Sequence, residues 1–379
     1  MRPQKAFGRW SAWAPTGKVF LRRRRPTPGA QRLGRPISIG VKAFGQWSAC
    51  ADRGKVSAET DFNQRAKSPL ERGAVEERWW VIVNPVAGNG RTGRRWGGLE
   101  ARLRVEGIRM EVVFTQEPGH ATALARQGIE AGFTTLVGVG GDGTLHEILN
   151  GLPLEDPERM QRIRLGMLPL GTGSDFVRTF GLPRDPVAAA LRLREGRVHW
   201  VDVGQVTCRR AGETVTRYFV NAAGLGFDGE VADRTNRGIK AFGATGTYLV
   251  YLFLTLLMYQ NKTVRLRLDG EEHAGRMNSV LVCNGRYFGG GMFIAPQAAV
   301  DDGWFDVIVL GDLGKGEIVW NLPRVYRGTH LTHPKITWRR AREVHVEAQE
   351  RMFLQAEGEL IGEAPAAFRL LPRALPFLA

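Results

Sequence analysis

A glycine turn within residues 137–151, with the sequence VGVGGDGTLHEILNG, carries the residues best suited to chemistry. It places one carboxylate, Asp142, and one hydroxyl, Thr144, among four glycines, and an apolar pattern at helical spacing follows. Glycine has no Cβ, so its backbone can adopt positive φ and lie close to a ligand. Free N–H groups in such a turn bind phosphate together with the positive end of the next helix. We therefore predict a polyphosphate site here.

Buried strands alternating with helices must position this turn. We predict strands over 79–84, 110–115, 135–139 and 165–168, and helices over 91–105 and 121–131. Such alternation is typical of a parallel sheet that is covered on both faces and binds its ligands at the carboxyl ends of the strands. Every glycine-rich segment of this region falls at that edge.

After about residue 201 the pattern changes to strands with few helices between them. We predict strands over 218–223, 263–268, 279–284, 305–310, 335–339, 344–347 and 353–355. This pattern indicates a β-sandwich, with the active site in the cleft between two domains. We therefore divide the chain into an extension over 1–77, an α/β domain over 78–200 and a β-rich domain over 201–379.

The positive charge of the chain is concentrated near its start. Residues 1–77 contain 16 Lys/Arg and 6 Asp/Glu, whereas the remaining residues contain 37 and 32. The segment KAFGRWSA at 5–12 recurs as KAFGQWSA at 42–49, without a sustained apolar period. We interpret residues 1–77 as a disordered extension outside the working protein. The Arg-rich composition, with no acidic residue before Asp52, leaves a transit peptide as the alternative.

The composition of the remaining chain indicates which classes of partner and which cellular compartment to expect. A mildly basic body suits an anionic nucleotide or an anionic membrane surface. No zinc-finger spacing, aromatic RNA-binding motif or recognition helix supports nucleic acid as a partner. Three widely spaced cysteines form no ligand pair, which favours a reducing, cytoplasmic location.

The most apolar stretch of the chain covers residues 244–259. It is shorter than the roughly 20 residues that span a bilayer. We interpret it as a buried helix that packs on the β-rich domain. The alternative is a surface helix where an apolar substrate enters or where the protein touches lipid.

Five further segments accompany the first glycine turn, and all six occur in a fixed order. The five are Asn84-Pro85-x-Ala87-Gly88-x-Gly90, LGTGSDF at 170–176, Asn221-x-x-Gly224-x-Gly226-Phe227-Asp228, Ala295-Pro296 through Asp301-Asp302-Gly303-x-Phe305-Asp306, and Glu357-Gly358-Glu359. From about Trp79 onward the chain resembles the diacylglycerol kinase catalytic-domain family, which includes soluble bacterial lipid kinases and the sphingosine and ceramide kinases.

This resemblance implies a phosphofructokinase/NAD-kinase-like α/β domain with a parallel sheet, followed by a β-sandwich domain. It implies ATP as the phosphoryl donor and a lipid hydroxyl as the acceptor. Diacylglycerol is the default lipid, met at a membrane surface by peripheral contact, and a homodimer is left open. The residues matched to nucleotide binding are Asn84, Thr115, Gly140, Gly141, Asp142, Gly143, Thr144, Leu145, His146, Glu147, Thr172 and Asp175.

The resemblance further implies a structural Mg²⁺, distinct from the ion that accompanies ATP. Its ligands are Asp302 and the main-chain carbonyls of Ala299 and Trp304. Oxygen ligands suit Mg²⁺. An ordinary acidic β-turn is the alternative, because Asp-Asp-Gly is also common turn chemistry.

The catalytic carboxylate is where the chain departs from the family, which usually shows Asp-Gly-Glu. Here the sequence is Glu357-Gly358-Glu359. We predict Glu357 as the base that accepts the hydroxyl proton, with Glu359 supporting it and Asp142 orienting the nucleotide or the lipid head group. The added methylene moves the carboxylate by about 1 Å, a displacement that can matter for the rate. A nucleotide-binding, membrane-associated regulator with weak catalysis is therefore an alternative.

Two other readings use the same glycines. Gly138, Gly140 and Gly143 satisfy G-x-G-x-x-G, which is typical of NAD-binding oxidoreductases. That hypothesis places the turn mid-domain rather than after the first strand, and it leaves five segments unexplained. An NAD or sugar kinase has a similar Gly-Gly-Asp-Gly, but the segments of the β-rich domain argue against it.

Overall fold

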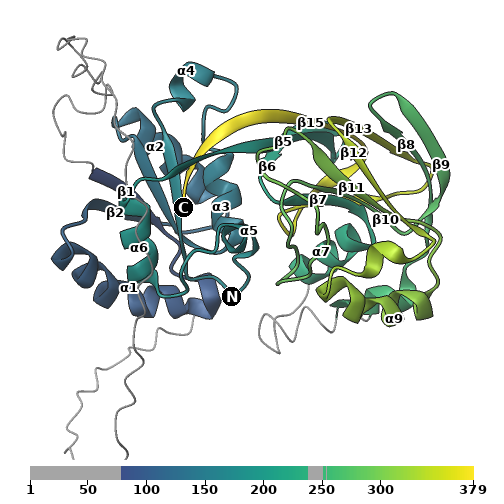
Figure 1. The fold of residues 1–379 in the computed structure, drawn as a ribbon, viewed down its shortest axis with the longest axis horizontal. Coiled ribbons are helices and arrows are strands. Elements are labelled where there is room, and N and C mark those ends of the chain that lie inside the picture. Colours follow the sequence, from purple (N-terminus) through teal and green to yellow (C-terminus); the bar gives the residue numbers. More distant parts are fainter. Residues whose placement is uncertain (1–77, 238–250, 253) are drawn as a thin grey trace, which may run out of the picture. The chain divides into compact units, whose positions relative to one another are not determined.

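The computed structural model describes residues 78–237, 251–252 and 254–379 (Figure 1). The predictions for residues 1–77, and for 244–250 and 253 of the apolar stretch, lie outside these ranges. The rest of that stretch is helical over 251–252 and 254–258. Within the described ranges, no helix is both long enough and apolar enough to cross a membrane.

The first domain is a parallel sheet in the order β2-β1-β3-β4. Its elements are β1 Arg78–Val83, α1 Ala87–Val105, β2 Arg109–Phe114, α2 His120–Glu130, β3 Thr135–Gly140, α3 Asp142–Leu149, α4 Pro157–Met160, β4 Arg164–Pro169, α5 Asp175–Thr179 and α6 Pro186–Arg194. The predicted parallel sheet is thus confirmed. Regular helix in α1 begins only at Arg91, because the three residues before it have left-handed φ.

Alternating side chains of β1 explain why both faces of this sheet are covered. Trp79 and Val81 belong to an apolar cluster with residues of α1 and α6, whereas Trp80 and Ile82 belong to one with residues of α2 and α3. Successive side chains of a strand point to opposite faces, so a fully apolar strand requires a helix layer on each side. The carboxyl edge of the sheet is left for the glycine turns.

The second domain is built mainly from antiparallel strands. Its elements are β5 Val198–Arg210, β6 Glu213–Phe219, β7 Ala222–Gly226, α7 Phe227–Arg237, β8 Lys262–Leu268, β9 Glu271–Met277, β10 Ser279–Cys283, β11 Phe305–Leu310, α9 Lys315–Tyr326, the 3₁₀ turn η2 His330–Thr332, β12 Ile336–Ala341, β13 Glu343–Ala348, β14 Phe353–Ala356 and β15 Glu359–Leu378. Strands β12, β11, β10, β7 and β14 form one layer, and β5, β6, β8, β9 and β13 lie off that path. One apolar cluster lies between them, with Phe219 stacked on Phe305. The predicted β-sandwich is confirmed.

The last strand, β15, connects the two domains. It pairs with β14, β13 and β5, and it then runs parallel to β4, with Phe377 opposite Leu165. Leu375 and Phe377 are fully buried in the core of the first domain. The end of the chain therefore completes the first domain, although the sequence pattern places it in the β-rich one.

One predicted strand is wrong in an informative way. Residues 218–223 do not form one strand, because β6 ends at Phe219 and β7 begins at Ala222. The break frees the N–H groups of Val220 and Asn221, which donate to the carboxylate of Glu357. A side chain distant in sequence therefore decides where these strands end.

Candidate active site

Two glycine turns meet at the carboxyl ends of β3 and β4. The N–H of Gly171 donates to the carbonyl of Gly140 at 2.8 Å. A Cβ on Gly171 would lie 2.3 Å from the Cα of Gly141, so this approach requires glycine. The expectation that the first turn uses positive φ is wrong, since none of its four glycines has it: Gly138, Gly140, Gly141 and Gly143. Their function is to leave room for neighbouring atoms.

Asp142 connects the two turns at the first position of α3. Its carboxylate accepts the N–H of Asp175 at 2.9 Å and that of Phe176 at 3.3 Å. Burial raises the pKa of Asp142, and the charge of Asp175 raises it further against these hydrogen bonds. The carboxylate of Asp175 accepts the N–H of Gly290, in the segment between β10 and β11, at 2.7 Å. These contacts link the glycine edge to the β-rich domain.

Glu357 reaches the same edge from the hairpin between β14 and β15. Glu357 and Gly358 form a two-residue turn with φ of 53° and 84°, as a type I′ turn requires. Oε1 of Glu357 accepts the N–H groups of Val220 at 2.9 Å and Asn221 at 2.7 Å. The turn and the broken strand thus fix the carboxylate that was predicted to be the base.

The carboxylates of this edge hold protons unusually strongly. Burial raises the pKa of Glu357 to about 8, and the nearby charge of Asp142 acts in the same direction. Burial also raises the pKa of Glu359 to about 7, with a further contribution from Glu147. A carboxyl group with a pKa near neutrality is suited to general base catalysis.

Four more of the predicted residues lie around the first glycine turn. Oε1 of Glu359 lies 3.0 Å from the position that a Cβ on Gly143 would occupy. The side-chain amide of Asn84 donates to the hydroxyl of Thr144 at 3.0 Å. Residues from β15, from the loop after β1 and from α3 therefore converge on one turn.

Thr115 and Thr172 occupy the same edge of the sheet. Thr115 directly follows β2, and its N–H donates to the carbonyl of Val83 at 2.9 Å. The backbone nitrogen of Thr172 lies 4.0 Å from the Cβ position of Gly141. Both threonines are thus placed at strand ends, where ligands of such sheets bind.

Three residues of α3 that were predicted to bind the nucleotide make other contacts in the structure. Leu145 and His146 are buried, and burial lowers the pKa of His146 to about 4. A nucleotide could meet only their main chain, and the N–H of Leu145 already donates to Gly141. Oε2 of Glu147 accepts the N–H of Ala121 at 3.0 Å, which holds α2 against α3. These side chains make contacts within the domain, and the nucleotide-binding role of the three residues stays a prediction.

A cavity of about 310 Å³ borders the carboxylates. Asp142, Asp175 and Glu357 contribute to its polar part. Most of the remaining wall is apolar and comes from α7, β10, α9 and the segment after β10, including Val231, Leu281, Phe288, Met292, Leu322 and Val325. The arrangement can hold an apolar molecule with one polar end beside Glu357.

The cavity also contains polar residues that the sequence analysis did not select as site residues. Asp228 and Gln355 line it, and the amide of Gln355 donates to Asp228 at 2.9 Å. Burial raises the pKa of Asp228 to about 6. Asn221 also lines the cavity. Two of the three fall within the quoted segment from Asn221 to Asp228, so the motif contained a usable indication.

The predicted magnesium ligands form a separate acidic turn. One oxygen of Asp302 accepts the N–H of Trp304 at 3.1 Å, and the other is paired with the Arg340 guanidinium at 3.2 Å. Over the described part of the chain, no three metal-ligating side chains form a candidate metal group. The carboxylate of Asp302 thus already has two partners, one of them a cation, and the magnesium site, which also includes the main-chain carbonyls of Ala299 and Trp304, stays a prediction.

Two family models match the chain. The diacylglycerol kinase catalytic domain matches residues 78–206, and the YegS C-terminal NAD kinase beta sandwich-like domain matches residues 221–379. These ranges correspond to the parallel sheet and to the sandwich, respectively.

Full-length relatives show the same similarity. A protein named diacylglycerol kinase from Staphylococcus carnosus is 29% identical over 294 residues, which cover 78% of this chain and 92% of that protein. A protein of the same name from Staphylococcus aureus is 27% identical over 305 residues, covering 80% and 93%. A solved structure from Bacillus anthracis, provisionally described as a diacylglycerol kinase, is 27% identical with a TM-score of 0.62, covering 80% and 95%.

Proposed function

We propose a function that starts from the family to which this chain belongs, that of the diacylglycerol kinase catalytic domain. Membership makes the chain a kinase-type phosphotransferase with a nucleotide as its donor. Our proposal is that it transfers the γ-phosphoryl group of ATP, carried as its Mg²⁺ complex, to the hydroxyl of a membrane lipid. The lipid we propose is diacylglycerol, which would yield phosphatidic acid.

The observation that carries this proposal is the cavity beside Glu357. It combines a mainly apolar wall with carboxylates supplied by both domains, Asp142 from the first and Glu357 from the second. An acyl chain gains free energy by leaving water for such a wall, at roughly 25 cal/mol per Å² of apolar surface. A sugar or a dinucleotide would gain little there, which speaks against the NAD-kinase and sugar-kinase alternatives.

On the donor side, the proposal uses the backbone of the two glycine turns. The N–H groups at the start of α3 carry the positive end of the helix dipole, and the glycines add no bulk near them. Asn84 and Thr144 supply an amide and a hydroxyl at the same place. A magnesium ion would arrive on the nucleotide phosphates, because Mg²⁺ usually binds through one or two carboxylates and the substrate phosphates.

In the chemical step, the lipid hydroxyl oxygen attacks the γ-phosphorus in line with the leaving oxygen. The carboxylate of Glu357 accepts the hydroxyl proton as the new O–P bond forms. The bond from the γ-phosphorus to the β,γ-bridging oxygen breaks, and ADP leaves with that electron pair. Two backbone N–H groups hold Oε1 of Glu357, so the base is positioned before substrate arrives.

The direct test is to incubate the full chain with labelled ATP and a panel of lipids in mixed micelles. The panel contains diacylglycerol, a sphingoid base, ceramide and a polyprenol, and the product is identified by its mass. We expect label in phosphatidic acid, and at least about 10²-fold less label per unit time with Glu357→Gln. Label in another lipid would change the acceptor, and ATP binding without product would favour the weakly catalytic regulator.

A further inference from the structure

The described residues expose nine large hydrophobic side chains, and six of them lie on two helical segments. The six are Leu254, Leu257, Met258, Val319, Trp320 and Tyr326. Leu257 is 65% exposed and Trp320 is 79% exposed. A soluble surface seldom gathers large apolar side chains in this way unless it contacts a partner or a membrane. We call these six residues the apolar face.

The two segments adjoin each other in the fold. The ammonium group of Lys315, the first residue of α9, donates to the carbonyl of Leu257. Leu256 and Ile318 also border one polar cavity between them. The two segments that carry the apolar face are therefore neighbours in the fold.

Helix α9 is apolar on opposite sides, which is unusual for a surface helix. Ile318, Leu322 and Val325 line the cavity beside Glu357, whereas Val319 and Trp320 are exposed. Leu252 lines the same cavity from the other segment. Val319 and Trp320 of the apolar face thus lie outside the cavity wall, whereas Tyr326 is exposed and also lines the cavity.

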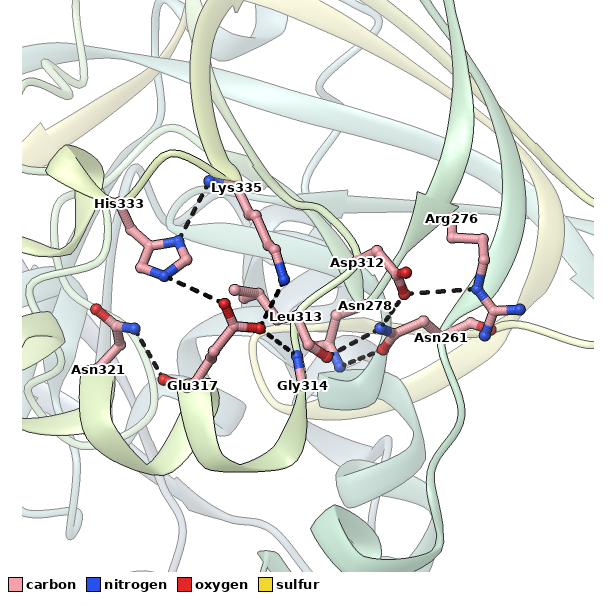
Figure 2. Close-up of polar contacts among 10 residues, drawn as sticks. All are labelled: Asn261, Arg276, Asn278, Asp312, Leu313, Gly314, Glu317, Asn321, His333 and Lys335. Atoms are coloured by element: carbon pink, nitrogen blue, oxygen red, sulfur yellow. Dashed lines mark hydrogen bonds and ion pairs between the residues drawn. The ribbon is translucent and has the colours of Figure 1, made fainter.

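The charges around the apolar face are mainly positive. Residues 315–328 contain three basic residues and one acidic residue, Glu317. Glu317 is paired with Lys335 at 2.8 Å and accepts the N–H of Gly314 at 2.7 Å (Figure 2). Its single negative charge is therefore neutralised within the protein, and the same contacts hold the first turn of α9. Basic residues beside an apolar, Trp-containing helix face are typical of helices that lie in the headgroup region of a bilayer.

We propose that the apolar face docks on the surface of a bilayer containing anionic lipids. Val319 and Trp320 enter the boundary between headgroups and acyl chains, and the nearby basic side chains contact anionic headgroups. The inference rests on the proposed lipid-kinase function, since docking would hold the apolar cavity wall against the membrane that supplies the substrate.

The test compares four full-length proteins: the wild type, Val319→Ser/Trp320→Ser, Trp320→Phe and the control Val105→Ser. Val105 is an exposed apolar residue at the end of α1, far in sequence from the apolar face. Binding is measured by co-sedimentation with vesicles of phosphatidylcholine and phosphatidylglycerol, and insertion by tryptophan quenching from brominated acyl chains. The basic residues 1–77 are present in every protein, so they contribute equally to sedimentation.

We expect the double variant to bind vesicles about tenfold or more weakly, because two apolar side chains no longer leave water. Val105→Ser should bind as the wild type does. Trp320→Phe should bind vesicles as the wild type does, because the side chain stays apolar. It should lose the part of the tryptophan quenching that Trp320 contributes. Equal binding by all four proteins, with the quenching of Trp320→Phe unchanged, would overturn the proposal. A dimer that the double variant converts to a monomer in lipid-free solution would assign the apolar face to a second copy instead.

A separate assay keeps the two proposals distinguishable. Short-chain diacylglycerol dispersed as monomers does not require docking, so the double variant should phosphorylate it at the wild-type rate. Long-chain diacylglycerol in vesicles should be phosphorylated about tenfold more slowly by the double variant, in step with its weaker binding. If no protein phosphorylates the short-chain lipid, the proposed function fails, while the vesicle measurements still decide the docking.

Discussion

Two acidic turns of the β-rich domain, Glu357-Gly358 and Asp302-Gly303, have similar composition and opposite surroundings. The Glu357 carboxylate is held by backbone N–H groups, has no cation partner among the described residues and lines the cavity. The Asp302 carboxylate is paired with Arg340 and with the N–H of its own turn. The comparison indicates that a carboxylate in an acidic turn can act as a base only where no cationic side chain is paired with it.

The largest effect should follow from Glu357→Gln. Glutamine keeps the size and an acceptor oxygen for Val220 and Asn221, but it cannot take a proton at neutral pH. We expect kcat for lipid phosphorylation to fall by about 10²–10⁴-fold, the usual contribution of a general base. This rate is measured as labelled phosphatidic acid formed per unit time at saturating substrate. A rate within tenfold of the wild type would reject Glu357 as the base.

The same variant should be more stable than the wild type. The pKa of Glu357 is raised from the ordinary glutamate value of 4.5 to about 8 in the folded protein, so the folded state retains a proton over this interval. The contribution of Glu357 to stability is therefore lost progressively as pH rises from about 4.5 to about 8. Thermal unfolding from pH 5 to pH 8.5 should show Glu357→Gln gaining on the wild type as pH rises. A constant difference would mean that this carboxyl titrates normally.

Asp142→Asn should reduce the rate by about 10²-fold, as expected for a group that positions reactants. The asparagine oxygen can still accept the N–H of Asp175, so the fold should survive, as circular dichroism can verify. The variant also removes a charge that raises the pKa of Glu357. The rise of kcat/KM with pH should therefore move to lower pH in the variant. A pH profile identical to that of the wild type would show that the charge of Asp142 does not influence the protonation of Glu357.

Much of this site could be predicted because it depends on short-range rules. Glycine turns after apolar strands predicted both the parallel sheet and the edge at which the candidate site residues meet. The contact of Asp142 with Asp175, by contrast, depends on two turns 33 residues apart meeting through Gly141 and Gly171. No periodicity contains that information.

The strand errors have the same origin. The break between Phe219 and Ala222 is determined by Glu357, more than a hundred residues later. The final strand was not predicted, because its 20 residues cross from one core into another and show no single alternation of burial. Long-range pairing overrides local pattern at both places.

The smallest effect should come from Asp302→Asn, which breaks the partly exposed pair with Arg340. Pairs of this kind contribute about 0–1 kcal/mol, so unfolding should shift by only a few degrees and the rate by less than about twofold. Thermal unfolding with and without Mg²⁺ tests whether the Asp302 turn, unlike the Glu357 turn, already has its counterion in Arg340. Since Arg340 supplies the positive charge at this turn, added Mg²⁺ should stabilise the wild type and Asp302→Asn equally. A stabilisation that only the wild type shows would place an ion at Asp302 and require Arg340 to move aside.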